Sequence, residues 1–202
     1  MIEDFSTSSK IEGVTGVILA GGTSSRMGRN KALLEINGSS IIARTYRALA
    51  GLFHEVVIVT NTPNDYAFIP CRKVPDIYPG IGSVAGLHSA LAHSTTGRTF
   101  VTACDMPFVD PIIIRHLCDL QLDEYDAVIP FSEGGQEPLH AVYTSKCKDV
   151  FEIAIKNGER KILDILARMN TRLVTWEEMK AIVGSTAAFL NVNTPEEYGT
   201  IS

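Results

Sequence analysis

Hydrophobic positions along the chain follow two alternating patterns. Runs of mainly apolar and β-branched residues predict buried strands, and they occupy residues 14–20, 55–60 and 98–104. The segments between and after them predict helices, over residues 39–53, 83–93 and 111–120. Strands that alternate with helices through short connections form a mainly parallel sheet with helices on both faces.

The last third of the chain has a different pattern. Residues 127–131 and 139–144 predict two strands that flank Glu133-Gly134-Gly135, which favours a small antiparallel excursion at one edge of the sheet. The resulting fold class is α/β: a three-layer arrangement with a mostly parallel, twisted sheet. Shorter elements are predicted as strands at 72–74, 172–174 and 189–192, and as helices at 146–156, 160–169 and 176–180.

Length and composition describe an ordinary globular protein. The 202 residues, 45% hydrophobic and 20% charged, suit a single domain, which we place at residues 13–202 after a flexible leader at 1–12. A net charge of −5 argues against a protein that binds duplex nucleic acid. No apolar run reaches the ~20 residues of a membrane helix, and the leader lacks the features of a signal peptide. The four scattered cysteines fit free thiols in a reducing compartment. We therefore expect a cytoplasmic protein without nucleic-acid or membrane partners.

The loop after the first predicted strand carries the strongest chemical signal. Ligands of α/β sheets bind at the carboxyl ends of the strands, and here Gly21 and Gly22 are followed by Arg26, Arg29 and Lys31 with no intervening carboxylate. Glycines let the backbone approach a ligand, and successive N–H groups can form an anion-binding nest. The spacing matches neither GxxxxGK[ST] nor GxGxxG. This composition predicts that the loop binds a polyphosphate. The alternative is a surface loop that is glycine-rich and basic but binds no ligand.

Two carboxylates follow later strands. Asp105 ends the run at 98–104, and one aspartate together with nucleotide phosphates and water is a usual way to hold Mg²⁺. Asp76 follows the short strand at 72–74. Either aspartate could instead cap a helix or stabilise a turn. His140, on the strand at 139–144, is the histidine that we consider for ligand contact.

Several segments together resemble a known family. The stretch at 19–31 (LAGGTSSRMGRNK) is similar to the signature of nucleotidyltransferases with a Rossmann-like fold. Further similar segments narrow the likeness: Asp76 with 82–87 (GSVAGL), 104–108 (CDMPF), 137–143 (EPLHAVY) and 191–197 (NVNTPEE). The match runs from about residue 14 to 198 and most resembles the molybdenum cofactor guanylyltransferases, which join GMP to molybdopterin.

The resemblance implies roles for individual residues. It places GTP contacts at Leu19, Ala20, Gly21, Gly22, Lys31, Asn61, Asp76 and Asp105. It implies catalytic roles for Lys31, Arg26 and Asp105, with the cofactor Mg²⁺ on Asp105, and it places Asn191, Asn193 and His140 on the pterin and phosphate side. The substrates would be GTP and molybdopterin, and proteins that deliver or receive the cofactor would be partners. This chain departs from the family where Asn30-Lys31 replaces the common Asp-Lys, so the loop has lost a carboxylate.

Other functions stay open at this point. A sister enzyme would use CTP on molybdopterin or act on a sugar or polyol phosphate. A carboxylate such as Asp76 could accept from the N1 and N2 donor edge of guanine, or it could lie beside the ribose or the metal, so the choice of base is undecided. The substitution at Asn30 keeps a non-catalytic nucleotide-binding module among the alternatives.

Overall fold

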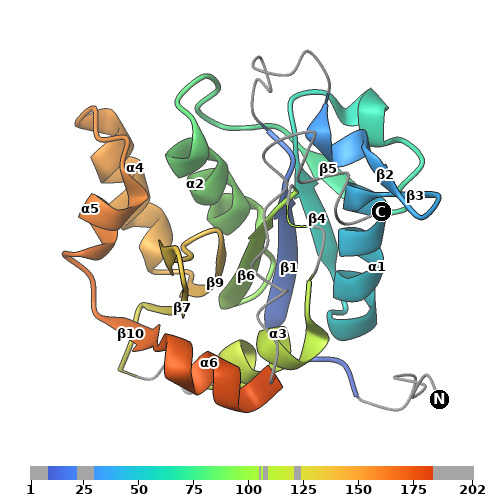
Figure 1. Cartoon of the computed structure of the whole chain (residues 1–202). Coiled ribbons are helices and arrows are strands. Elements are labelled where there is room, and N and C mark those ends of the chain that lie inside the picture. Colours follow the sequence, from blue (N-terminus) through green and yellow to red (C-terminus); the bar gives the residue numbers. More distant parts are fainter. Residues whose placement is uncertain (1–8, 22–29, 105, 107–108, 121–123, 184–202) are drawn as a thin grey trace.

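The central feature of the computed structural model is an eight-stranded sheet (Figure 1). The structure describes residues 9–21, 30–104, 106, 109–120 and 124–183. In spatial order the strands are β10 (Thr171–Val174), β7 (Ala127–Ser132), β9 (His140–Thr144), β6 (Arg98–Ala103), β1 (Val14–Leu19), β4 (Val56–Val59) and β5 (Arg72–Val74), and the short β8 (Gly135–Gln136) pairs with β7.

Strand direction divides the sheet into two parts. β1 pairs in parallel with both β4 and β6, and β5 is parallel to β4. β9 is antiparallel to β6 on one side and to β7 on the other, and β8 forms an antiparallel pair with β7. The predicted α/β fold, with its parallel sheet and its antiparallel excursion in the last third, is confirmed.

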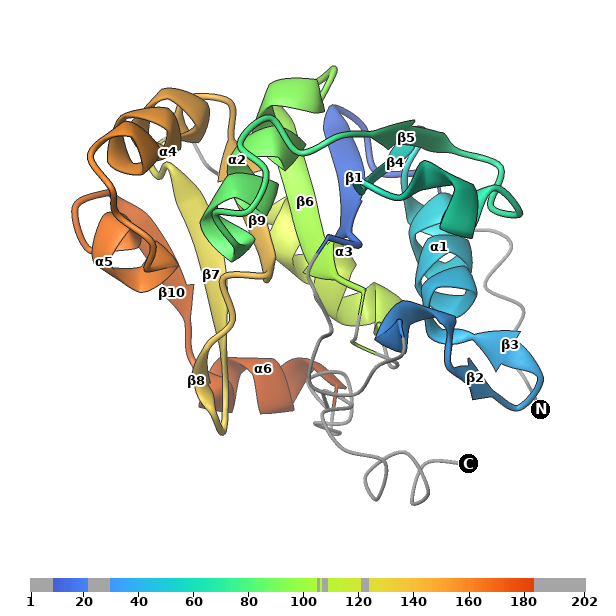
Figure 2. The same cartoon turned by 90° about the horizontal axis from the view of Figure 1, so that it is seen from above.

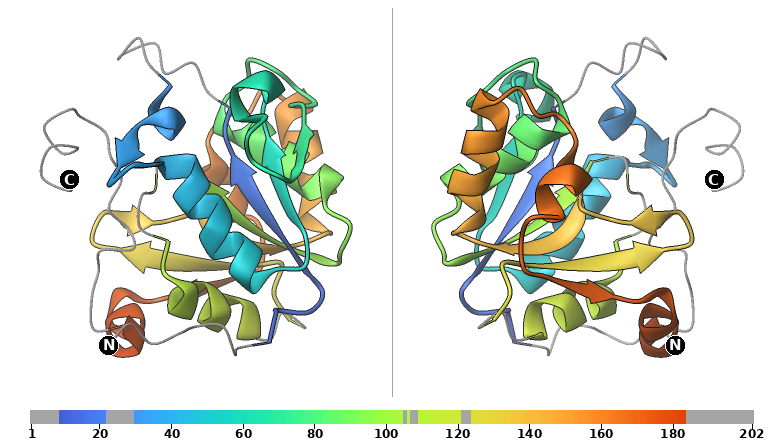
Figure 3. Two further views of the ribbon diagram at one scale, coloured as in Figure 1. Left: turned by 90° about the vertical axis from the view of Figure 1, so that its right-hand side faces the viewer. Right: turned by 90° about the vertical axis from the view of Figure 1, so that its left-hand side faces the viewer.

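Helices cover both faces of the sheet (Figures 2 and 3). One layer consists of α1 (Ile41–Leu52), α3 (Pro111–Asp119) and α6 (Trp176–Val183), and the other of α2 (Ser83–His93), α4 (Cys147–Lys156) and α5 (Ile162–Leu166). Side chains alternate between the two faces of a strand. In β1, Val14 and Ile18 accordingly join the first core and Val17 and Leu19 the second. Burial on both faces explains why β1 contains no charged residue and why the hydroxyl of its Thr15 is paired with that of Thr96 at 2.9 Å.

One glycine within β1 is required by packing. A Cβ atom at Gly16 would lie 2.5 Å from Cδ2 of Phe53, closer than two carbon atoms can approach. The Phe53 ring follows the end of α1 and stacks on Phe100 with 5.7 Å between the ring centroids. Glycine at position 16 therefore lets the first helix pack against the sheet.

Several boundaries differ from the prediction. Ile11, which the sequence places in a flexible leader, is buried, and its N–H donates to Leu52 O at 2.7 Å. The predicted helix over 39–53 begins only at Ile41, because β3 (Ser39–Ser40) pairs with β2 (Glu35–Ile36) across a turn at Asn37-Gly38. The predicted helix over 160–169 is shortened to α5. The strand expected at 189–192 lies outside the described residues.

The carboxyl ends of the parallel strands meet at one edge of the sheet. Leu19 lies in register with Val59 of β4 and Ala103 of β6, and Val59 with Val74 of β5. The residues that follow these four strands are therefore neighbours in space. No helix in the described part of the chain is long and apolar enough to span a membrane.

Candidate nucleotide-binding site

The chain emerges from the sheet at the start of the glycine-rich loop. Ala20 extends the ladder beyond β1, since its N–H donates to Val59 O at 2.9 Å, and Cys104 N–H donates to Leu19 O at 3.1 Å. Leu19 and Ala20 are buried, whereas Gly21 is exposed, and a Cβ atom there would meet nothing within 4 Å. Gly21 thus marks the point at which the backbone becomes accessible to a ligand.

Asn61 and Asp76 are brought together because they follow the neighbouring strands β4 and β5. Asp76 N–H donates to Asn61 Oδ1 at 2.9 Å, and Asp76 Oδ1 accepts from Ser89 Oγ at 2.8 Å. Burial raises the pKa of Asp76, although the Ser89 hydroxyl opposes this shift. No described residue donates to the second carboxylate oxygen, Oδ2. This oxygen is available to a donor of a ligand.

Ser89 is a site residue that the sequence analysis missed. It lies in α2 and is fully buried, and its Oγ accepts from Ile77 N–H at 2.9 Å while donating to Asp76. Its signal in the sequence was a hydroxyl inside a helix that is otherwise mostly apolar. A buried hydroxyl is costly unless it has hydrogen-bond partners, and here those partners lie in the segment that carries the candidate aspartate.

The far end of the glycine-rich loop is held by Asn30. Its Oδ1 accepts from Ala32 N–H at 3.2 Å and caps a 3₁₀ turn, Lys31–Leu33, of which Lys31 is the first residue. Asn30 Nδ2 donates to the hydroxyl of Tyr66 at 2.8 Å. Lys31 is partly buried. The cation predicted for phosphate binding is therefore positioned by a cap that the substitution of Asn for Asp has kept.

Asp105 lies outside the described residues, whereas its two neighbours in the chain, Cys104 and Met106, lie within them. Met106 is 2% exposed, and its backbone oxygen accepts from Thr45 Oγ1 at 3.4 Å. Its sulfur lies 3.7 Å from Thr102 Oγ1. The preceding residue, Cys104, is bound to β1 through its N–H. The chain is thus anchored on both sides of the predicted metal ligand.

His140 lies inside the sheet. The side chain is 0% exposed, its Nδ1 lies 3.2 Å from Thr102 Oγ1, and its ring meets Phe100 edge to face with 5.1 Å between the centroids. Burial lowers its pKa to about 4, so the imidazole is neutral at pH 7. This position gives no support to the prediction that His140 contacts the pterin side of the ligand.

The remaining predicted site residues, Gly22, Arg26, Asn191 and Asn193, lie outside the described part of the chain, and their roles stay predictions. Within the described residues, no three or more histidine, cysteine, aspartate or glutamate side chains gather into a group that could hold a metal ion. A resident metal site made of several protein ligands is therefore absent from this part of the chain.

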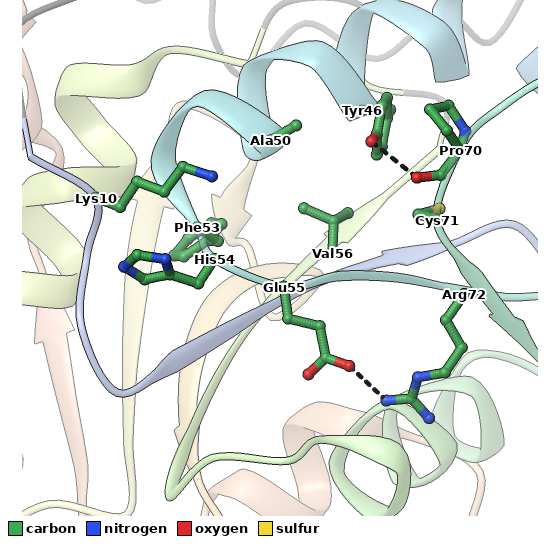
Figure 4. A pocket seen from close by; sticks show the side chains of 10 residues that line it. All are labelled: Lys10, Tyr46, Ala50, Phe53, His54, Glu55, Val56, Pro70, Cys71 and Arg72. Carbon is green, nitrogen blue, oxygen red and sulfur yellow. Dashed lines mark hydrogen bonds and ion pairs between the residues drawn. The ribbon is translucent and has the colours of Figure 1, made fainter.

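A depression at the opposite edge of the sheet has a different character (Figure 4). It lies where β4 and β5 begin, and Phe53 and Val56 are among the residues that line it. Two of its polar groups are already paired: Arg72 Nη2 lies 2.9 Å from Glu55 Oε1, and the Tyr46 hydroxyl donates to Pro70 O at 3.1 Å. The carboxyl edge of the parallel strands, with its polar groups, is therefore a better candidate for a nucleotide site than this depression.

Comparison with known proteins extends over most of the chain. Residues 16–173 match the family described as MobA-like NTP transferase domain. The chain is 36% identical over 183 residues to a protein of Pelotomaculum thermopropionicum named probable molybdenum cofactor guanylyltransferase, covering 91% of this chain and 89% of that one. It is 33% identical over 188 residues to the molybdenum cofactor guanylyltransferase of Desulfosudis oleivorans, with 93% of each chain covered.

Among solved structures, the molybdopterin-guanine dinucleotide biosynthesis protein A of Archaeoglobus fulgidus has a similar fold. The TM-score is 0.82 at 30% sequence identity, and the superposition covers 93% of this chain and 96% of that one. The likeness therefore includes both the parallel strands and the antiparallel excursion.

Proposed function

The chain belongs to the family of MobA-like NTP transferase domains, and from this premise we propose that it transfers GMP from GTP to the terminal phosphate of molybdopterin. The products are molybdopterin guanine dinucleotide and pyrophosphate. The observation that carries this proposal is the carboxyl edge of the parallel strands, where Gly21, Lys31 and the bonded residues Asn61 and Asp76 follow β1, β4 and β5.

The reaction is an in-line substitution at the α-phosphorus of GTP. An oxygen of the terminal molybdopterin phosphate forms the new P–O bond, the bond from the α-phosphorus to its bridging oxygen breaks, and pyrophosphate leaves. The attacking oxygen is already anionic, so the protein need not supply a general base. Positioning and charge stabilisation carry most of the catalysis in such transfers.

The glycine-rich loop would perform most of that work. N–H groups of Gly21 and Gly22 would bind the phosphates, since successive backbone donors form an anion site. Lys31 and Arg26 would offset the charge that grows on the α-phosphate and on the departing pyrophosphate. The cap by Asn30 fixes the turn that begins at Lys31, and from there the Lys31 side chain would reach the phosphates.

Asp76 would contact the nucleoside part of GTP. Its Oδ1 is held by Ser89 and its backbone by Asn61, which leaves Oδ2 to accept from the N1 and N2 edge of guanine or from a ribose hydroxyl. A carboxylate that accepts from guanine would find no such donor edge on cytosine. The ionised carboxylate of Asp76 would make the stronger hydrogen bond in either contact.

Mg²⁺ fits the donor chemistry of this edge. Mg²⁺ is commonly bound by one or two carboxylates together with substrate phosphates and water, and Asp105 would be the carboxylate. The nucleotide phosphates and water would complete the coordination. When bound, the ion would neutralise phosphate charge.

The test is a thermal-unfolding panel with GTP, CTP and ATP, each with and without Mg²⁺, followed by a product assay with molybdopterin. A ligand at 100 times its Kd stabilises the native state by about 2.7 kcal/mol, which raises Tm by roughly 5–11 °C for a chain of this size. A Mg²⁺-dependent shift with GTP supports the proposal. A shift with CTP alone would replace it with cytidylyl transfer, and binding of GTP without product would indicate a non-catalytic module.

A further inference from the structure

We infer that Tyr66 is a positioning residue for GTP: its hydroxyl connects the two ends of the glycine-rich loop and so orients the Gly21 N–H and Lys31 toward the nucleotide. On one side the hydroxyl faces Ala20 O, and on the other it accepts from Asn30. This inference rests on the proposed function, because it assigns the role of one further residue at the same site.

The link to the first end of the loop acts through a single peptide group. A trans peptide is planar, so its C=O and its N–H point in opposite directions. The Tyr66 hydroxyl lies 3.5 Å from Ala20 O, and the N–H on the other side of that peptide belongs to Gly21. Any contact that holds Ala20 O therefore also sets the direction of the Gly21 N–H. The distance is long for an O–H···O bond, and we expect it to shorten when a phosphate engages Gly21.

The link to the second end has a defined direction. Asn30 Oδ1 already accepts from Ala32 N–H, so the amide nitrogen is the atom that faces Tyr66, at 2.8 Å. An amide NH₂ can only donate. The phenol oxygen accepts this bond, and its own proton is left to point at Ala20 O. An aspartate at position 30 could only accept, and it would draw the phenol proton away from Ala20.

The ring of Tyr66 packs in the core, and a phenylalanine at this position would pack in the same way without the hydroxyl. The Tyr66 side chain is 1% exposed and belongs to the core that contains Ile69 and Ala32. A buried hydroxyl costs free energy unless it is hydrogen-bonded, and burial raises the pKa of Tyr66, so the group stays a neutral donor. Among its described neighbours, the hydroxyl contacts the two ends of the loop.

The experiment compares the full-length Tyr66→Phe and Asn30→Ser proteins, their double variant and a control. Asn30→Ser keeps an oxygen that can cap the 3₁₀ turn but is too short to reach Tyr66. The control is Tyr46→Phe, which removes the same kind of phenol-to-carbonyl bond, to Pro70 O, at the opposite edge. GTP affinity is measured by calorimetric titration with Mg²⁺ present, and Tm is measured without nucleotide.

We expect Tyr66→Phe and Asn30→Ser each to weaken GTP binding by about 3- to 10-fold, the size of one net hydrogen bond. Because both substitutions break one chain of bonds, the double variant should be about as weak as the weaker single variant. In the transfer assay KM for GTP should rise while KM for molybdopterin stays unchanged. Tyr46→Phe should bind GTP as the wild type does.

The outcomes separate this inference from the function on which it rests. If the wild-type protein does not bind GTP, the proposed function fails and the inference with it. If the wild type binds GTP and Tyr66→Phe binds it equally well, only the inference is overturned. Additive losses in the double variant, or an equal loss in Tyr46→Phe, would also overturn it. Should Tyr66→Phe fail to fold, Asn30→Ser alone decides by the same affinity measurement.

Discussion

The parallel half of the sheet and its antiparallel excursion place polar residues in very different surroundings. In the parallel half, Asp76 stands just beyond the end of a strand, half-buried and bonded to Ser89 and to Asn61. In the excursion, His140 stands within a strand and has no exposed surface. Both residues follow from the sequence as ligand candidates. A polar side chain can therefore contact a ligand when it lies at the open end of a strand, and its chemistry alone does not decide this.

The strongest test of this comparison is charge removal at the parallel edge. Lys31→Ala, and separately Asp105→Ala, should lower kcat for GMP transfer by roughly 10²- to 10³-fold, the effect of losing one preorganised stabilising group. The measurement is steady-state formation of pyrophosphate from GTP and molybdopterin. Turnover within tenfold of the wild-type value in both variants would remove these residues from the catalytic machinery.

The buried histidine should appear in the pH dependence of stability instead of in catalysis. Its folded-state pKa of about 4 lies below the ordinary value of 6.5, so on acidification the unfolded chain takes up a proton before the native protein does. The free energy of unfolding is therefore unaffected by this group above pH 6.5. It falls as the pH drops from 6.5 to about 4, and the loss levels off below that. A shift of this size corresponds to a loss of up to about 3 kcal/mol.

Urea unfolding at a series of pH values measures this contribution. In His140→Asn, which keeps a polar atom near the position of Nδ1 but does not titrate, the slope between pH 6.5 and 4 should become shallower while kcat changes little. An unchanged slope would contradict the assignment, and a selective rise of KM for molybdopterin would restore His140 to the pterin side.

A smaller effect on GTP binding is expected at Ser89, which contacts Asp76 and not the nucleotide itself. Ser89→Ala removes a donor that lowers the pKa of Asp76, so the carboxylate should take up a proton at a higher pH. GTP affinity should fall about 3- to 10-fold at neutral pH, the size of one net hydrogen bond, and its loss on acidification should begin at a higher pH than in the wild type. Asp76→Asn is the matched control, because it should abolish this pH dependence. If GTP affinity depended on pH identically in Ser89→Ala and the wild type, Ser89 would have no role at the site.

The smallest effect is expected at the opposite edge. Arg72→Gln breaks the partly exposed pair with Glu55, and such pairs contribute up to about 1 kcal/mol. Tm should change slightly and GTP affinity should not change at all, although β5 leads directly to Asp76. A clear loss of GTP binding in this variant would show that the two ends of the strand are coupled.

Much of the fold follows from local pattern. The apolar runs predict β1, β4 and β6 to within one or two residues, because strands that are buried on both faces consist mostly of apolar and β-branched residues. The helix boundaries are less accurate. Ser39 and Ser40 read as the start of a helix, yet they pair with Glu35 and Ile36 in a small hairpin, and only the position of that partner strand excludes them from α1.

Part of the candidate site was also predictable from local sequence pattern. Gly21, Lys31, Asn61 and Asp76 all lie just after an apolar run, or in the loop that follows one, and the rule that ligands bind at the carboxyl ends of strands then predicts a shared edge. Ser89 and Tyr66 were not predicted as site residues, because each is buried in a segment whose residues are sufficiently explained by packing in the core. Their polar partners lie 13 residues away, at Asp76, and 46 residues away, at Ala20.

The alternation of strands and helices, the glycine-rich basic loop and the family were all recognisable before the structure, since each is carried by short segments of neighbouring residues. Three features became visible in the folded chain alone: the hydrogen bond from Asp76 N–H to Asn61, the contacts of the Tyr66 hydroxyl with Ala20 and Asn30, and the complete burial of His140. Periodicity encodes which face of an element is apolar. Which elements become neighbours depends on pairing and packing between distant segments, and this decides which polar groups remain exposed to a ligand.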